Sequence, residues 1–233
     1  MIYVYGLSYR VASYAKKSLD SIIANASEPI RIIVGDNPSP KSIETVSLLQ
    51  EYKAGHKISS YLLFEKNIKT RAFLKMYQAL PPDDECDFFV FTELDLVVPT
   101  GLDWIQELKA MRRLGAVDCG FSLSLSNYVP PNSGHDPDLN GHAMGIWLLG
   151  IDNLIFRKTY PMNGPFTDTL LHAHMSQFGK KIRSRKELYH LGWDLWRDDP
   201  DYWKLKLDVY NSGIGSSYRN YWQHIDDSAF SLY

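Results

Sequence analysis

The sequence predicts an α/β fold in which a parallel sheet is covered by helices. Through the first hundred residues, short apolar runs alternate with segments of helical periodicity, a rhythm typical of strand–helix–strand units. Breaks fall between these units at Pro81 and Pro82, and again at Pro99 and Gly101. With 233 residues, 45% of them hydrophobic, the chain can bury one sizeable core. We therefore expect a single domain over residues 1–233.

The individual elements follow from the same patterns. Strands are expected at residues 2–7, 30–35, 58–64, 87–92 and 117–124, and helices at 11–25, 41–53, 69–80, 102–113 and 166–178. The apolar segment 144–156 is expected to form one or two strands. The tail from Trp193 is rich in Trp, Tyr and Asp, which favours a partly helical cap over a central strand.

Composition excludes several classes of function. The 25 basic and 27 acidic residues leave a net charge of −2, so no bulk charge indicates binding to nucleic acid or anionic lipid. The start of the sequence has no pattern of a signal peptide, and no apolar run reaches the roughly 18 residues that span a bilayer. We expect a cytoplasmic protein, with peripheral membrane association left open. Cys86 and Cys119 lack metal-ligand spacing, and Cys119 is expected to be a buried free thiol.

Two acidic residues follow the apolar strand that ends near Thr92. Glu93 and Asp95 stand two apart at the carboxyl end of this strand, which is where open α/β sheets bind ligands. Carboxylates at such a place suit Mg²⁺ or Mn²⁺, which complete their shells with phosphate oxygens and water. A cap for the following helix is an equally good interpretation of the spacing alone.

This segment resembles the aspartate-any-aspartate metal motif of GT-A glycosyltransferases, especially those of the inverting family 2. The apolar strand precedes it, and Pro99 follows four residues after the second acid. Glu93 stands in place of the usual first aspartate. The resemblance therefore implies that Asp95 holds the metal, while Glu93 and Leu94 belong to the donor-binding residues.

Other strand ends match the family in order. The run from Gly6 through Ser8 to Arg10 resembles the opening strand, which in the family contacts the nucleoside. Asp36 and Asn37 end the second strand, where the family's aspartate accepts hydrogen bonds from the nucleobase; an aspartate that starts a Pro-containing turn is the alternative.

Basic residues mark the helix that begins after the third expected strand. Arg71 lies at the start of this helix, where a guanidinium and free backbone N–H groups can meet pyrophosphate oxygens. A solvated basic turn is the alternative interpretation of Arg71.

The second half supplies two further candidates. Asp168 matches the family's catalytic base, which takes the proton of the acceptor hydroxyl; a first-turn aspartate favoured by the helix dipole is the alternative. His190 resembles the late histidine that completes the metal shell in several family members, although a lone histidine is more often structural. His172 and His174 alternate within a helix and are expected on the helix surface or in the acceptor pocket.

The resemblance implies an inverting transfer of a sugar from a UDP-, GDP- or dTDP-linked donor to a carbohydrate or glycolipid acceptor, with Mn²⁺ or Mg²⁺ as cofactor. Residues 1–100 would bind the donor, 101–192 the acceptor, and 193–233 would form a cap. The loop Asn127–Gly141 and the tail are expected to act as a lid. Two rivals stay open. A nucleotidyltransferase normally has a glycine-rich loop that is missing here, and a non-catalytic carbohydrate-binding domain would fit the departures from the motif.

Overall fold

The computed structural model describes residues 1–127, 145–204 and 230–233. The first half alternates as expected: β1 (Ile2–Tyr9), α1 (Ala12–Ala24), β2 (Ile30–Asn37), α2 (Ser42–Ala54), β3 (Ser60–Phe64), η1 (Lys69–Arg71), α3 (Ala72–Ala79), β4 (Phe88–Glu93), β5 (Leu96–Val97) and α4 (Trp104–Arg113). The second half contains β6 (Ala116–Leu123), β7 (Leu149–Asp152), α5 (Asn153–Thr159), α6 (Asp168–Met175), β8 (Lys180–His190), η2 (Leu191–Asp194), α7 (Leu195–Asp198) and β9 (Phe230–Leu232).

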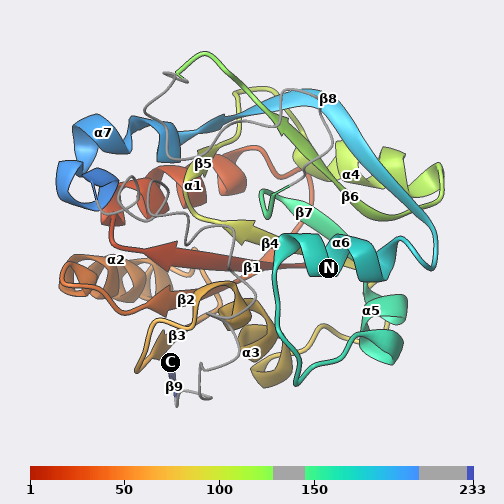
Figure 1. The fold of residues 1–233 in the computed structure, drawn as a ribbon, viewed down its shortest axis with the longest axis horizontal. Helices are drawn as coiled ribbons and strands as arrows, with labels where there is room; N and C mark the ends of the chain where they lie inside the picture. Colours follow the sequence, from red (N-terminus) through yellow and green to blue (C-terminus); the bar gives the residue numbers. More distant parts are fainter. Residues whose placement is uncertain (128–144, 205–229) are drawn as a thin grey trace.

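The strands form one mixed sheet in the order β5-β8-β6-β7-β4-β1-β2-β3-β9. In Figure 1, β4, β1, β2 and β3 follow one another down the picture. β1 is parallel to both β2 and β4, and β3 is parallel to β2. β7 is antiparallel to β4 and β6, and β9 is antiparallel to β3. The expected parallel arrangement therefore holds for the strands that carry the first candidate residues.

Hydrophobic cores fill both faces of the sheet. Along β4, Phe88 and Val90 face a core built with α1, α2 and α4, while Phe89 and Phe91 face a core built with α3, α5 and α6. Side chains of a strand alternate between faces, so a strand buried on both sides is apolar throughout. This is why the run before Glu93 lacks polar alternation and why its carboxyl end is the first place where a carboxylate can reach solvent.

One predicted segment differs from the structure. The apolar run 144–156 was expected to form one or two strands, but within its described part it forms only β7 before the chain turns into α5. Asp152 caps this helix, since its side chain accepts from the backbone N–H of Ile155 at 2.8 Å. Phe156 then packs into the core from a helix, where an apolar run alone cannot be told from a strand.

The described part of the tail is partly helical, as predicted. It forms η2 and α7, and Leu191, Leu195 and Trp203 pack with Tyr14 of α1 in a third, smaller cluster. Tyr14 also donates from its hydroxyl to Asp198 at 2.8 Å. α7 is consequently fixed beside α1, at the end of the sheet toward which β1 points (Figure 1). Across the described ranges, no helix combines the length and apolar character that crossing a bilayer requires.

Candidate functional site

The candidate residues of the first half lie at the carboxyl ends of β1, β2 and β4. From β1 the chain proceeds through β2 to β3 on one side, whereas β4 lies on the other side of β1. A reversal of this kind marks the crevice where open α/β sheets bind ligands. The register places Ser8 opposite Asp36 and Leu7 opposite Glu93. The structure thus brings three predicted segments to one edge of the sheet.

Asp95 and His190 meet although they are far apart in the sequence. Oδ2 of Asp95 lies 3.1 Å from Nε2 of His190. β5 and β8 cause this meeting, because Leu96 pairs with His190 and the N–H of Leu191 donates to the carbonyl of Asp95 at 2.6 Å. The imidazole is only 5% exposed and packs edge-on against Trp147 and Trp193. The two predicted residues therefore lie side by side, and the imidazole of His190 is held by buried aromatic contacts.

The pair has the spacing of two ligands of one hard divalent ion. Two ligands at about 2.1 Å and at right angles on such an ion lie about 3 Å apart, close to the observed 3.1 Å. A Cβ at Gly192 would lie 2.7 Å from Nε2 of His190 and 3.0 Å from Oδ2 of Asp95, so no larger residue fits beside them. In the described part of the chain, no group of three or more His, Cys, Asp or Glu side chains is arranged so that it could hold a metal ion.

The hydrogen bonding of His190 distinguishes the two candidate ligands. A neutral histidine that binds a metal through Nε2 carries its proton on Nδ1, where a hydrogen-bond acceptor normally orients the ring. Nδ1 of His190 is buried, and no residue of the described ranges accepts from it. Asp95, whose carboxylate is 25% exposed at the edge of the sheet, is the stronger of the two candidates.

Asp36 is more buried than its predicted role suggests. It is 3% exposed, and the hydroxyl of Ser8 donates to its Oδ1 at 2.6 Å. Burial raises the pKa of Asp36 to about 6, although hydrogen bonds from Ser8 and Ser42 act in the opposite direction. Ser8 thus donates to a buried carboxyl group whose ionisation is disfavoured by its surroundings.

Three predicted donor-binding residues have structural contacts. Asn37 uses both ends of its amide on the turn before α3: Nδ2 donates to the carbonyl of Lys69 at 3.1 Å, and Oδ1 accepts from the N–H of Ile68 at 3.2 Å. A Cβ at Gly6 would lie 3.0 Å from the side chain of Leu94, which is buried. Gly6 thus lets Leu94 pack against β1, and a donor contact of these three residues stays a prediction.

Arg10 follows β1 in a left-handed conformation, with φ of 68°. Few residues other than glycine, asparagine and aspartate adopt this region without an external constraint. The N–H of Val11 donates to the carbonyl of Tyr9 at 2.9 Å, so Arg10 is the central residue of a tight turn before α1. Its side chain contacts the tail: Nε lies 3.3 Å from Oδ2 of Asp199, and the guanidinium lies 4.9 Å from the ring centre of Tyr202. Arg10 is therefore held by residues that the sequence analysis did not connect to it.

Asp168 and Arg71 lie on neighbouring segments. Asp168 is the first residue of α6, and Thr167 caps the helix by accepting from the N–H of Leu170 at 3.1 Å. The hydroxyl of Thr70 donates to the carbonyl of Phe166 at 2.8 Å, which joins η1, with Arg71, to the start of α6. Within the described residues, Oδ1 of Asp168 accepts hydrogen bonds from the N–H and the hydroxyl of Thr169.

His172 corrects one expectation. It was expected on the helix surface or in the acceptor pocket, but it is buried, and Nδ1 hydrogen-bonds to Oδ2 of Asp118 in β6. Asp118 is fully buried and escaped the sequence analysis, where a single aspartate inside an apolar strand was its only signal. His174 lies at the surface, 2.9 Å from the hydroxyl of Thr159, as expected.

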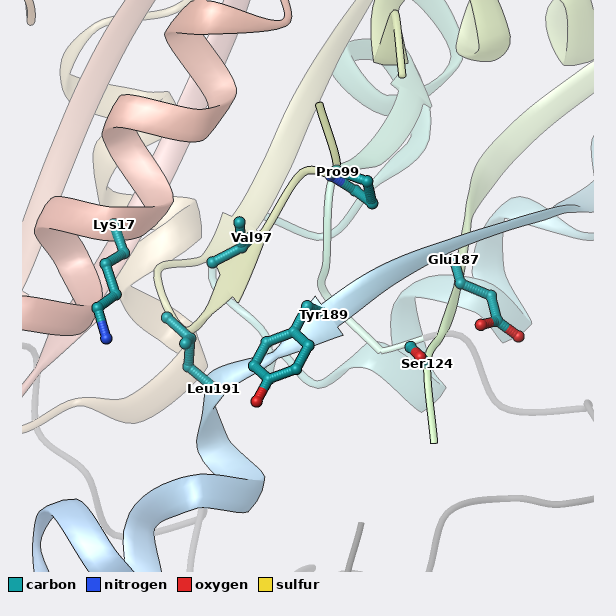
Figure 2. Close-up of a pocket in the computed structure, with 7 residues that line it drawn as sticks. All are labelled: Lys17, Val97, Pro99, Ser124, Glu187, Tyr189 and Leu191. Carbon is teal, nitrogen blue, oxygen red and sulfur yellow. The ribbon is translucent and has the colours of Figure 1, made fainter. Parts of the chain in front are cut away.

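A shallow hollow lies on the outer side of the β5–β8 pair (Figure 2). Its volume is about 610 Å³, and its lining consists of Lys17, Val97, Pro99, Ser124, Glu187, Tyr189 and Leu191. Side chains alternate along β8, so Tyr189 faces this hollow while His190 faces inward. None of the predicted site residues lines the hollow. The two expected lid segments fall mainly on residues 128–144 and 205–229, outside the described residues.

Comparison with known proteins defines the fold. No protein-family model and no curated protein matches the chain. Among solved structures, the chain is similar to the mannosyltransferase PcManGT from Pyrobaculum calidifontis in complex with GDP-Man and Mn²⁺, with a TM-score of 0.63 and 11% identity over 98% of this chain and 65% of that one.

It is also similar to a fragment of S. aureus TarS, residues 1–349, with a TM-score of 0.56 and 13% identity over 82% of this chain and 60% of that one. The same TarS fragment in complex with UDP gives a TM-score of 0.52 at 14% identity, over 94% of this chain and 73% of that one. The chain therefore spans about 60% of the TarS fragment and 65% of the mannosyltransferase. The predicted GT-A α/β fold is confirmed.

Proposed function

We propose that this chain is an inverting glycosyltransferase that moves a sugar from a nucleotide-sugar donor to a hydroxyl group of a carbohydrate or glycolipid. The meeting of Asp95 with His190 at 3.1 Å is the main support. It lies at the sheet edge of a fold shared with a mannosyltransferase that was solved with GDP-Man and Mn²⁺.

Asp95 and His190 would hold Mn²⁺ or Mg²⁺, which when bound would supply positive charge to the nucleoside diphosphate as it leaves. The acceptor oxygen forms its bond to the anomeric carbon while the bond from that carbon to the phosphate oxygen breaks. Asp168 takes the proton of the acceptor hydroxyl through Oδ2, since Oδ1 is already engaged by Thr169.

The nucleoside side of the donor lies at β1 and β2 in this proposal. Asp36 accepts hydrogen bonds from the nucleobase, and Ser8 orients its carboxyl group from 2.6 Å. Arg71, on the segment that Thr70 ties to α6, is placed to meet the phosphates. Glu93, partly exposed at the end of β4, contacts the donor sugar or ribose.

A ligand panel tests the proposal. Thermal unfolding of the wild-type protein is measured with UDP-, GDP- and dTDP-sugars, each with and without Mn²⁺. We expect one nucleotide class to raise the midpoint in the presence of Mn²⁺, because a ligand that binds only the native state stabilises it. Asp95→Ala should lose this shift and keep the apo midpoint. Asp84→Ala is the matched control, since Asp84 is 82% exposed and lies outside the site.

Product analysis then separates the rivals. Metal-dependent release of the nucleoside diphosphate, with inversion at the sugar, supports the transferase. Binding of a nucleotide sugar without release or transfer would instead indicate a non-catalytic carbohydrate-binding domain. Release of pyrophosphate from a nucleoside triphosphate and a sugar phosphate would indicate a nucleotidyltransferase. An unchanged Mn²⁺-dependent shift in Asp95→Ala would remove Asp95 from the site.

A further inference from the structure

Two cations surround one buried carboxylate at the carboxyl edge of the sheet. Oδ2 of Asp199 lies 3.3 Å from Nε of Arg10 and 3.3 Å from Nζ of Lys41. The side chain of Asp199 is only 2% exposed. Arg10 follows β1 and Lys41 precedes α2, so the two cations come from different connections of the sheet. This three-residue cluster is called the latch below.

The latch keeps its carboxylate charged. Burial by itself raises the pKa of Asp199, but hydrogen bonds from Arg10 and Lys41 outweigh it and hold the pKa below its ordinary value. A charged group this deeply buried is tolerated only when it is paired. Arg10 and Lys41 therefore form a site for an anion, and in this structure the anion belongs to the protein itself.

The segment that carries Asp199 also contacts the end of β1. The N–H of Tyr202 donates to Oδ1 of Asp199 at 3.4 Å, and the ring of Tyr202 packs edge-on against Tyr9 at 5.4 Å. Burial raises the pKa of the Tyr202 hydroxyl, and the charges of Glu93 and Asp95 raise it further. Tyr202 thus contacts the end of β1 from the same segment that carries Asp199.

The side chain of Arg10 is held by the tail. Its Nε lies 3.3 Å from Oδ2 of Asp199, and its guanidinium lies 4.9 Å from the ring centre of Tyr202. Release of the tail would therefore free the guanidinium of Arg10 to meet another anion.

We propose that Arg10 and Lys41 bind the phosphates of the donor, and that Asp199 occupies their site in the ligand-free protein as an internal competitor. The inference rests on the proposed function for the identity of the anion. Entry of a diphosphate exchanges the carboxylate of Asp199 for phosphate oxygens on the same two cations. The segment 199–203 then moves, and Tyr202 leaves its contact with Tyr9 at the end of β1.

Competition of this kind makes the apparent affinity for phosphate equal to the intrinsic affinity multiplied by the fraction of molecules in which the latch is open. Asp199→Asn keeps the shape of the side chain and removes its charge, so it should raise that fraction. The matched control is Asp198→Asn, because Asp198 is the preceding residue and its carboxylate pairs with Tyr14 and Arg197 instead of the two latch cations.

Calorimetric titration with inorganic pyrophosphate, and separately with UDP and GDP in the presence of Mn²⁺, tests the inference on the full chain. We expect Asp199→Asn to bind pyrophosphate about tenfold more tightly than the wild-type protein, and Asp198→Asn to bind it as the wild type does. Lys41→Gln should bind pyrophosphate more weakly than the wild type, and adding it to Asp199→Asn should remove the gain. Amide exchange of residues 195–203 should accelerate in Asp199→Asn.

Equal or weaker pyrophosphate binding by Asp199→Asn overturns the inference, as does an equal gain in Asp198→Asn. If Asp199→Asn gains pyrophosphate affinity while no variant binds a nucleotide sugar, the anion site stands and the proposed function fails. If the wild type binds and turns over a nucleotide sugar while Asp199→Asn changes neither affinity, the latch alone is wrong. Unfolding midpoints measured for each variant show whether an unchanged affinity comes from a native protein.

Discussion

Replacing Asp36 with asparagine should stabilise the native protein at neutral pH while it weakens nucleoside binding. Burial raises the pKa of Asp36 to about 6 from an ordinary value of 3.8. The native state therefore holds its proton more tightly than the unfolded state does. At neutral pH the carboxylate must ionise in a site that disfavours its charge, and asparagine removes this cost because it has no charge.

The magnitude follows from the difference in pKa. About two units at 1.36 kcal/mol each correspond to about 3 kcal/mol. Below pH 4 the carboxyl group is protonated in both states, so no cost exists. Between pH 4 and pH 6 the unfolded state ionises while the native state keeps its proton, and the free energy of unfolding falls as the pH rises. Above pH 6 the loss is complete.

Urea unfolding of the wild type and Asp36→Asn at pH 4, 5.5 and 7.5 measures this. We expect a gain of about 1 to 3 kcal/mol at pH 7.5, and a gain near zero at pH 4. The hydroxyl of Ser8, which donates to Oδ1 at 2.6 Å, can still donate to the asparagine oxygen. Nucleotide affinity, measured on the same variant, should fall because an accepting carboxylate oxygen is lost.

Asp20→Asn is the control of opposite sign. Burial raises the pKa of Asp20, but hydrogen bonds from Lys16 and Tyr52 and the charge of Lys57 outweigh it, so the net pKa is lowered. Ionised Asp20 thus favours the native state, and its replacement should reduce stability at pH 7.5 and have little effect at pH 3. A gain for Asp36→Asn that is the same at pH 4 as at pH 7.5, or a loss at pH 7.5, would refute the reasoning.

Three further substitutions address the reaction and the core. Asp168→Asn should lower transfer by about 10² to 10⁴ and leave donor affinity nearly unchanged, since it cannot take a proton; an equal loss of donor affinity in titrations would make Asp168 structural. His190→Gln should weaken Mn²⁺-dependent nucleotide binding about tenfold, and unchanged Mn²⁺ titrations would leave Asp95 as the only protein ligand. Asp118→Asn removes the carboxyl group that hydrogen-bonds to buried His172 and should lower the free energy of unfolding by about 1 to 3 kcal/mol in urea. A change under about 0.5 kcal/mol would show that the pair is not needed for stability.

The parts of the fold that were predicted correctly are those with local causes. β1, β2, β3 and β4 follow from apolar runs between breaks, and parallel strands bring their ends to one edge, so Asp36 and Asp95 could be placed there without coordinates. The prediction for 144–156 is correct for β7 and wrong for residues 153–156, because an apolar run has the same composition in a buried helix and in a buried strand. The cap at Asp152 was the local signal that separates them.

The latch could not be predicted from local sequence. Arg10 and Asp199 are separated by 189 positions, and neither residue type nor spacing relates them. Asp199 stands in an acidic stretch that also fits a solvated surface. Likewise, the burial of His172 depends on Asp118 in another element, so helical periodicity around His172 gave no warning of it. Contacts between distant elements decide these positions.

The last described residues cover the edge of β3. β3 would be an edge strand, but β9 pairs with it antiparallel from Leu62 to Phe64, and the ring of Tyr233 stacks on Tyr61 at 5.1 Å. An uncovered edge offers free N–H and C=O groups to another molecule and promotes aggregation. β9 then ends the sheet itself, but it has only three residues, and the last two are exposed. A short edge strand offers fewer free groups than β3 would, so an extension fused after Tyr233 is expected to disturb the cover of β3 more than one fused before Met1.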